Sequence, residues 1–160
     1  MDTRIEVAGS DLESLFREEG PLLWRALYAY TGGRRDVADD AVAEAFARAI
    51  EHRATIRRPR PWVFRVAFRL ATAEMRAERG RSELVDMGVE DAPSLAELMS
   101  AMRTLSPYQR AAVYLHHQAD LPVREVARLM GTSASAVKVH LFRGRRRMAE
   151  LLGEEGADDE

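Results

Sequence analysis

Apolar residues recur along most of the chain at the three- and four-residue spacing of amphipathic helices, and alternating strand-like runs are few. The first apolar stripe ends at Gly32-Gly33, and Gly20-Pro21 either kinks its helix or divides it into two. The stripe comprises Leu12, Leu15, Phe16, Leu23, Leu27 and Tyr30. This pattern predicts an all-α fold.

Two more helices are predicted before residue 81. Asp36 or Asp39 is placed to cap the first of them. Its expected buried face comprises Val42, Phe46 and Ile50. Residues 54–61 read as a loop because two prolines stand two residues apart, and Pro61 suits the first turn of a helix that ends at Gly80. The expected buried face of that helix comprises Trp62, Val66, Leu70 and Ala73.

Candidate capping residues and prolines in the C-terminal third predict three further helices. The expected start residues are Ser106 with Pro107 for one helix, Pro122 for the next, and Thr132 or Ser133 for the last. The middle helix is expected to end at Gly131, because glycine adopts the left-handed backbone of a tight turn at little cost. The last helix is expected to reach about residue 152.

Residues 121–143 have the pattern of a helix-turn-helix, with the small Ala127 where the two helices cross and Gly131 in the turn. The residues expected to point inward are Val126, Leu129, Met130, Val137 and Leu141. The outward face, which a DNA major groove could accept, comprises Ser135, Lys138, Val139, Phe142 and Arg143. Arg145, Arg146 and Arg147 follow at positions suited to phosphate contacts. The alternative is an ordinary helical hairpin whose arginines serve solubility.

The net charge of −2 conceals a strong segregation of charge. Residues 53–81 carry nine arginines against two acids, and residues 103–148 carry nine bases against two acids. Two basic blocks on helical patterns favour a polyanionic partner. We expect two small helical domains at 1–81 and 94–152, an acidic flexible linker at 82–93, and a disordered acidic tail at 153–160.

Several classes of protein are disfavoured. The chain has no cysteine, which excludes disulfides and thiolate metal sites, and no apolar run approaches the length of a membrane span. Its first residues do not read as a secretion signal, so a cytoplasmic bacterial protein without membrane insertion is expected. The four histidines form no metal-ligand pattern and no phosphate-binding loop stands out. We therefore expect no enzymatic activity, no cofactor and no metal.

The segment from Leu105 to Arg147 resembles region 4 of the extracytoplasmic-function (ECF) sigma factors of the sigma-70 family. The matching positions are Leu105, Arg110, Val113, Leu121, Glu125-Val126-Ala127, Met130-Gly131, Ser133, Val137-Lys138, Leu141 and Arg143-Gly144-Arg145. The N-terminal domain is similar to region 2 of the same family. Its matching segments are Asp40-Ala41-Val42-Ala43-Glu44-Ala45-Phe46 and Trp62-Val63-Phe64-Arg65-Val66-Ala67.

The resemblance implies an RNA polymerase sigma factor that directs core polymerase to specific promoters and helps to initiate transcription. It assigns the −35 element to Ser135, Lys138, Val139, Phe142, Arg143, Arg146 and Arg147. It assigns the −10 element to Arg57, Arg58, Arg60, Arg65 and Arg69, and polymerase binding to Asp40, Glu44 and Arg48. The implied partners are promoter DNA, the β′ clamp and β flap of core polymerase, and an anti-sigma factor.

The chain departs from the family pattern in region 2. The family usually has Arg-Asn after the second motif and an Asp shortly afterwards, where this chain has Phe68-Arg69 and Ala73. These departures predict an unusual −10 preference. They also leave open a second hypothesis, a sigma-like regulator that binds DNA or polymerase without initiating transcription. The acidic linker further suggests a closed arrangement in which it lies against the basic faces.

Overall fold

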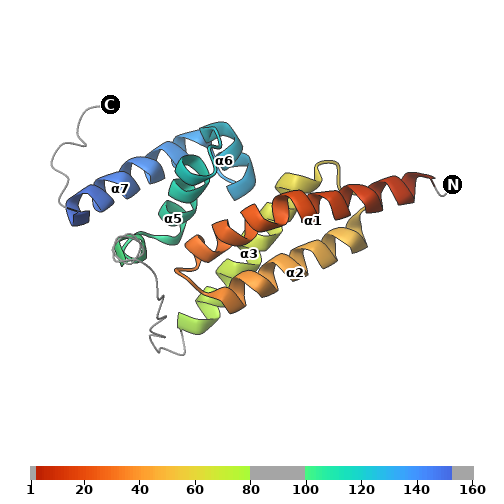
Figure 1. The fold of residues 1–160 in the computed structure, drawn as a ribbon, viewed down its shortest axis with the longest axis horizontal. Coiled ribbons are helices and arrows are strands. Elements are labelled where there is room, and N and C mark those ends of the chain that lie inside the picture. Colours follow the sequence, from red (N-terminus) through yellow and green to blue (C-terminus); the bar gives the residue numbers. More distant parts are fainter. Residues whose placement is uncertain (1–2, 80–99, 153–160) are drawn as a thin grey trace.

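The computed structural model describes residues 3–79 and 100–152, and all regular structure in these residues is helical. The elements are α1 (Thr3–Tyr30), α2 (Arg35–His52), α3 (Pro59–Arg79), α5 (Pro107–Val113), the π-helical turn η1 (Tyr114–Gln118), α6 (Val123–Met130) and α7 (Ala134–Leu152). Residues 100–103 are also helical. Helices α1 to α3 form one unit and the elements from α5 onward form another beside it (Figure 1). The predicted linker at 82–93, the helix end at Gly80 and the tail at 153–160 lie outside the described residues.

Helix α1 is continuous through Pro21 rather than divided there. Contacts with α2 hold it on both sides of the proline. Before Pro21, the Phe16 ring packs edge-on against the Phe46 ring, with 5.0 Å between centroids. After it, Trp24 Nε1 donates a hydrogen bond of 2.6 Å to Asp39 Oδ1. Phe16 nevertheless stays 53% exposed, so it belongs to the edge of the core and not, as predicted, to its interior.

The predicted cap of α2 is wrong. Its N-cap is Arg34, which makes no side-chain capping bond, and the chain reaches it through Gly32 and Gly33 at positive φ. The Arg34 side chain instead donates to Asp36, and it also pairs with Glu78 near the end of α3. This guanidinium holds the pKa of the Asp36 carboxyl below its usual value. Arg34 thus ties the α1–α2 turn to α3, so an acidic side-chain cap is replaced by a tertiary ion pair.

Helix α3 begins at Pro59, within the segment predicted as a loop, and buries a different face from the one predicted. The buried residues are Val63, Phe64, Ala67, Phe68 and Ala71. Of the predicted face, Trp62, Val66 and Leu70 are only partly buried and Ala73 is exposed. The reason is that α3 packs against both α1 and α2 on one side and α6 on another, so its apolar surface is wider than one stripe. On α2, Val42 and Phe46 are buried as predicted, whereas Ile50 is 51% exposed.

The second unit follows its sequence signals closely. Ser106 and Gln109 form a reciprocal capping box at the start of α5, with Pro107 in the first turn. Helix α6 ends at Gly131 with a left-handed φ of 67°, as predicted for the turn. Ser133, rather than Thr132, caps α7, and its Oγ accepts a 3.1 Å bond from Ala136 N. The predicted inward residues of the helix-turn-helix are all buried.

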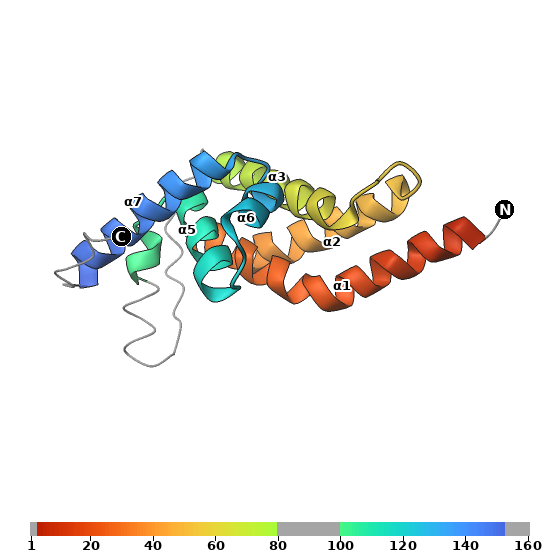
Figure 2. The same cartoon turned by 90° about the horizontal axis from the view of Figure 1, so that it is seen from above.

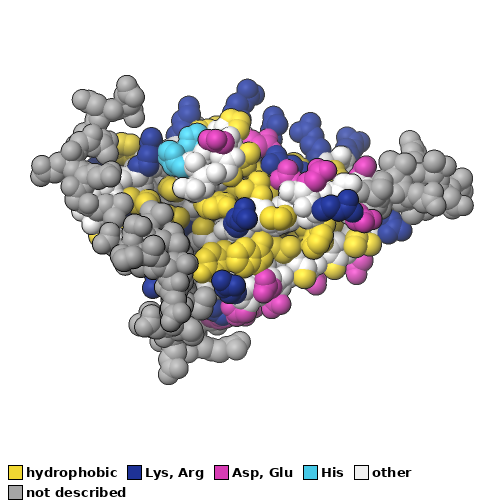
Figure 3. Space-filling view, viewed as in Figure 1, with side chains coloured by type: hydrophobic (Ala, Val, Ile, Leu, Met, Phe, Trp, Pro, Cys, Tyr) yellow, Lys and Arg dark blue, Asp and Glu magenta, His cyan; other side chains and the backbone are white. Residues whose placement is uncertain are grey.

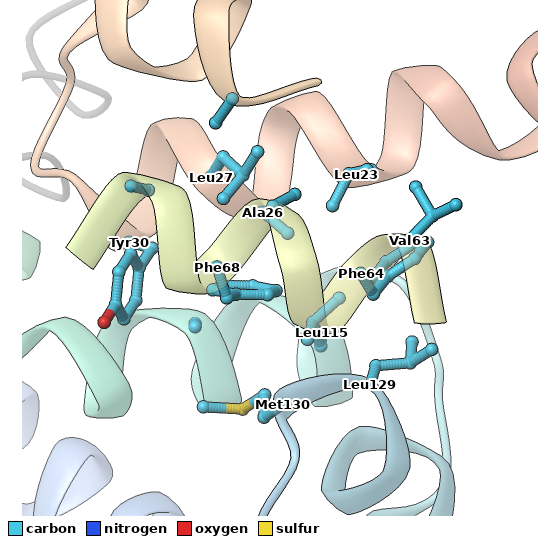
Figure 4. Close-up of a cluster of buried hydrophobic side chains, with 14 of the residues drawn as sticks. Leu23, Ala26, Leu27, Tyr30, Val63, Phe64, Phe68, Leu115, Leu129 and Met130 are labelled. Atoms are coloured by element: carbon cyan, nitrogen blue, oxygen red, sulfur yellow. The ribbon is translucent and has the colours of Figure 1, made fainter. Parts of the chain in front are cut away.

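One hydrophobic core runs through both units (Figure 4). Leu23, Ala26, Leu27 and Tyr30 of α1 and Val63, Phe64 and Phe68 of α3 share it with Leu115 of η1 and Leu129 and Met130 of α6. The view from above shows the second unit beside the C-terminal end of α1, and its helix α6 packs along α3 (Figure 2). The two units are therefore packed together, not merely connected.

A buried arginine completes this junction. Arg110 of α5 is 7% exposed, and its guanidinium donates to the carbonyl oxygens of Ala29 (2.7 Å) and Tyr30 (2.7 Å) at the end of α1. A third bond, of 2.6 Å, reaches the carbonyl of Leu105 in its own unit. The last carbonyls of a helix lack partners within the helix and carry its negative dipole end, so a cation suits them. Arg110 therefore caps α1 from the other unit.

Replacing Arg110 by lysine should lower the free energy of unfolding by about 2 kcal/mol, because lysine keeps the charge but cannot present the planar fork to three carbonyls. Urea unfolding of the full chain measures the change. Arg124→Lys, at an exposed position of α6, is the control and should change stability by less than about 0.5 kcal/mol. Equal stability of both variants would show that the Arg110 fork contributes nothing.

Gly144 marks the closest approach of α7 to α5. A Cβ at this position would lie 2.9 Å from Val113 Cγ2, which is tighter than a carbon–carbon contact allows. Glycine within a helix costs about 1 kcal/mol relative to alanine, but overpacking costs about 1–3 kcal/mol. We therefore expect Gly144→Ala to destabilise the protein despite its better helix propensity.

The pair Gly144→Ala and Val113→Ala tests the cause. Val113→Ala removes the obstructing methyl groups, so the double variant should be more stable than the sum of the two single changes predicts. Thermal unfolding of the parent chain, the two single variants and the double variant measures this difference. Strict additivity would rule out the Val113 contact as the reason for the glycine.

Candidate nucleic-acid and polymerase interface

The outward face of α7 is presented as the sequence predicts. Val137 and Leu141 are 0% and 3% exposed and pack α7 into the core. Ser135, Lys138, Val139, Phe142 and Arg143 are all exposed on the other side. Arg146 and Arg147 are exposed as well, and each lies 3.5 Å from Glu150 across one turn of the helix. The face offers two cationic donors, a hydroxyl and two apolar side chains, a set suited to base edges and thymine methyl groups.

The other side of α7 is linked to the first unit through Tyr108 of α5. His140 stacks on Tyr108, with 5.5 Å between centroids and 17° between planes, and Tyr108 packs edge-on against Tyr30 of α1 at 5.8 Å. Burial and the nearby Arg143 guanidinium lower the pKa of His140, which favours the neutral form of the ring. Neither ring was assigned a role by the sequence analysis.

The predicted polymerase-facing residues form one stripe of α2. Asp40 and Glu44 are exposed, and Glu44 Oε1 pairs with Arg48 Nε at 2.8 Å, one turn further on. Asp40 and Glu44 also line a surface hollow of about 530 Å³ between α2 and α3, together with Glu74 and Leu70. Three carboxylates, of Asp40, Glu44 and Glu74, therefore surround a partly apolar hollow.

The predicted −10 residues fall into two groups. Arg57 and Arg58 are exposed in the turn before α3. Arg60 is 28% exposed, because its guanidinium pairs with Glu19 of α1 and with Glu125 of α6. This residue therefore holds the two units together in the structure and is not available to nucleic acid.

Arg65 and Arg69 also face the second unit. The stem of Arg65 lies against the helix-turn-helix, so that a Cβ at Gly131 would be 3.2 Å from Arg65 Cδ. Both arginines line a cavity of about 620 Å³ between α3 and the α6–α7 turn. Thus three of the five predicted −10 residues lie at the junction with the second unit.

Arg76 and Arg128 line the same cavity, and the sequence reasoning assigned neither of them a site. The spacing of Arg65, Arg69 and Arg76 by four and seven residues was a usable signal for one cationic face of a helix. Nothing in the sequence could show that α6 faces it.

Figure 3 shows Lys and Arg side chains projecting along the upper edge of one face of the molecule, while Asp and Glu are spread over this face and also occur along its lower edge. None of the described helices is both long and apolar enough to cross a membrane. The fold and these surfaces define a two-unit helical protein with a cationic helix-turn-helix face and an acidic hollow beside α2.

Comparison with known proteins agrees with this class. The model of sigma-70 region 2 matches residues 15–81, and that of sigma-70 region 4 matches residues 95–148. The chain is 31% identical to the RNA polymerase sigma-E factor of Streptomyces antibioticus, over 82% of this chain and 68% of the relative. It is 30% identical to the ECF RNA polymerase sigma factor BldN of Streptomyces coelicolor, over 86% of this chain but only 59% of BldN. The chain belongs to the sigma-70 family, in its ECF group.

Two solved structures share the fold. The sigma factor RpoE from Bartonella quintana, in complex with the anti-sigma factor NepR, superposes with a TM-score of 0.71 at 21% identity, covering 91% of this chain and 99% of that one. CnrH, in complex with the cytosolic domain of CnrY, superposes with a TM-score of 0.68 at 22% identity, covering 96% and 97%. The predicted all-α, two-unit fold and the family resemblance are confirmed.

Proposed function

We propose that the protein is an RNA polymerase sigma factor that directs core polymerase to specific promoters in the bacterial cytoplasm. The observation that carries this proposal is the exposed face of α7. Ser133 caps this helix, and the inward residues of the helix-turn-helix are buried in the core. In this proposal Lys138 and Arg143 donate to base edges in the −35 element, Val139 and Phe142 make apolar contacts there, and Ser135, Arg146 and Arg147 approach the backbone.

The first unit would supply the other two activities. Asp40, Glu44 and Arg48 would dock on the β′ clamp, and the hollow beside them supports this because acidic and apolar groups meet there. Arg57 and Arg58 would meet the −10 strand first, since they are exposed before α3.

The full −10 surface requires the two units to separate. Arg60 pairs with Glu125, so it is not available to DNA while the two units are packed together in the closed arrangement. Arg65 is exposed, but its stem lies against Gly131 of the second unit, which flanks this side of α3. We propose that binding to core polymerase, including the β flap, supplies the energy of opening, since a ligand shifts an equilibrium only by its preference for one state. An anti-sigma factor that prefers the closed state would oppose it. The complexes of RpoE with NepR and of CnrH with CnrY support such a partner.

Transcription in vitro tests the proposal. Core RNA polymerase from a related bacterium is incubated with genomic DNA from the source organism, with and without the protein, and the 5′ ends of the transcripts are sequenced. New start sites that depend on the protein and share upstream sequence elements are expected. Stable binding to core without any new start site would instead support a regulator that does not initiate.

The −35 assignment is tested separately with Arg143→Ala. Losing one bidentate contact to a guanine should weaken binding to such promoters by about 1–3 kcal/mol, while affinity for core polymerase is unchanged. Arg145→Ala removes the same charge from the same helix about 200° around its axis, and should weaken specific and non-specific DNA binding equally. Loss of core binding in Arg143→Ala would show that the DNA-facing side of α7 is misassigned.

A further inference from the structure

The cavity between α3 and the helix-turn-helix has an unusual lining. Four arginines face it: Arg65, Arg69 and Arg76 from α3, and Arg128 from α6. No aspartate or glutamate is among its described lining residues. Within the described part of the chain, none of the three α3 arginines forms an ion pair, and Arg128 has only a long contact of 3.6 Å with Glu125.

The described lining supplies no full counter-charge to these four exposed arginines. Helix α6 ends at the cavity, and its C-terminal dipole supplies about half a negative charge, which offsets a small part of four guanidinium groups. Solvent screens the remaining repulsion when the cavity is empty. A bound phosphate group would gain bidentate, charge-assisted hydrogen bonds from arginines that are already brought together.

The rest of the lining narrows the ligand class. The volume of about 620 Å³ is that of a site for a molecule of drug size and much exceeds the space that a single phosphate needs. Tyr108 is 42% exposed at the wall, so a ligand can meet the part of its ring that His140 and Tyr30 leave uncovered, and Thr132 adds a hydroxyl. Aromatic rings bind nucleobases by stacking, whatever the base.

We propose that this cavity binds a nucleoside polyphosphate, with the phosphates on the arginines and the base against Tyr108. Because α3 and α6 both contribute arginines, the ligand bridges the two units and stabilises the closed arrangement. A ligand that binds one state shifts the equilibrium towards it. Nucleotide binding at this cavity does not depend on the proposed promoter function. If that function holds, the bound nucleotide would cover Arg65 and Arg69 and so reduce their access to DNA.

Calorimetric titration of the full chain with ATP, at physiological ionic strength, tests the proposal. One ATP per chain is expected, together with a rise in the melting temperature. Arg76→Gln on α3 and Arg128→Gln on α6 should each weaken binding about tenfold. The matched control is Arg124→Gln, one turn before Arg128 on α6 and outside the cavity lining, which should bind as the parent chain does. Circular dichroism of each variant without ATP checks its fold.

Each other outcome overturns the proposal in a defined way. Absence of saturable binding at millimolar ATP would show that the cavity does not bind a nucleotide. Equal weakening in the control would mean non-specific attraction to a basic surface, and a response of only one of the two cavity variants would mean that the ligand does not bridge the units. Inorganic triphosphate should bind more weakly than ATP. Equal affinity of the two would show that the base contributes nothing to binding. If the same variants weaken the binding of a single-stranded oligonucleotide but not of ATP, the cavity is part of the DNA-binding surface.

Discussion

The junction of the two units depends on the Arg110 guanidinium, which lies buried against the last carbonyls of α1. A buried charge is tolerated only when hydrogen bonds satisfy it. Carbonyl groups without a partner inside the helix are found only at its C-terminal end. Gly32 and Gly33 end α1 at that point, and the guanidinium packs 3.6 Å from where a Cβ on Gly32 would stand. The end of one helix thus fixes how the second unit is positioned.

From that position follow the other contacts across the junction. Tyr108, two residues before Arg110, is placed between Tyr30 and His140, which orients α7. Helix α6 is brought to α3, where Glu125 pairs with Arg60 and Gly131 receives the stem of Arg65. The same packing leaves the outward face of α7 exposed and places α6 against part of the cationic face of α3. Of the five arginines proposed for the −10 element, Arg60 is paired across the junction and the other four stay exposed.

The sequence predicted the second unit well because its signals are local. The capping box at Ser106, the left-handed Gly131 and the Ser133 cap each act within four residues, and together they fix which side of α7 faces out. The first unit was predicted less well, because its outcomes depend on contacts between distant residues. Pro21 does not divide α1, since α2 holds it on both sides, and α3 buries a wider face than one stripe, since α6 packs on it. The junction itself has no sequence signature.

The departures from the family pattern in α3 have a physical reading in this junction. Phe68 stands where the usual pattern has an arginine, and it is a core residue here, 6% exposed and packed edge-on against Tyr30 at 5.0 Å. Ala73 stands where the pattern has an acid a little later, and it lines the arginine cavity. A carboxylate at that position would neutralise part of the cluster and occupy the space of an anionic ligand. Phe68 thus serves the packing of α3 on α1, and Ala73 leaves the cavity between the units cationic.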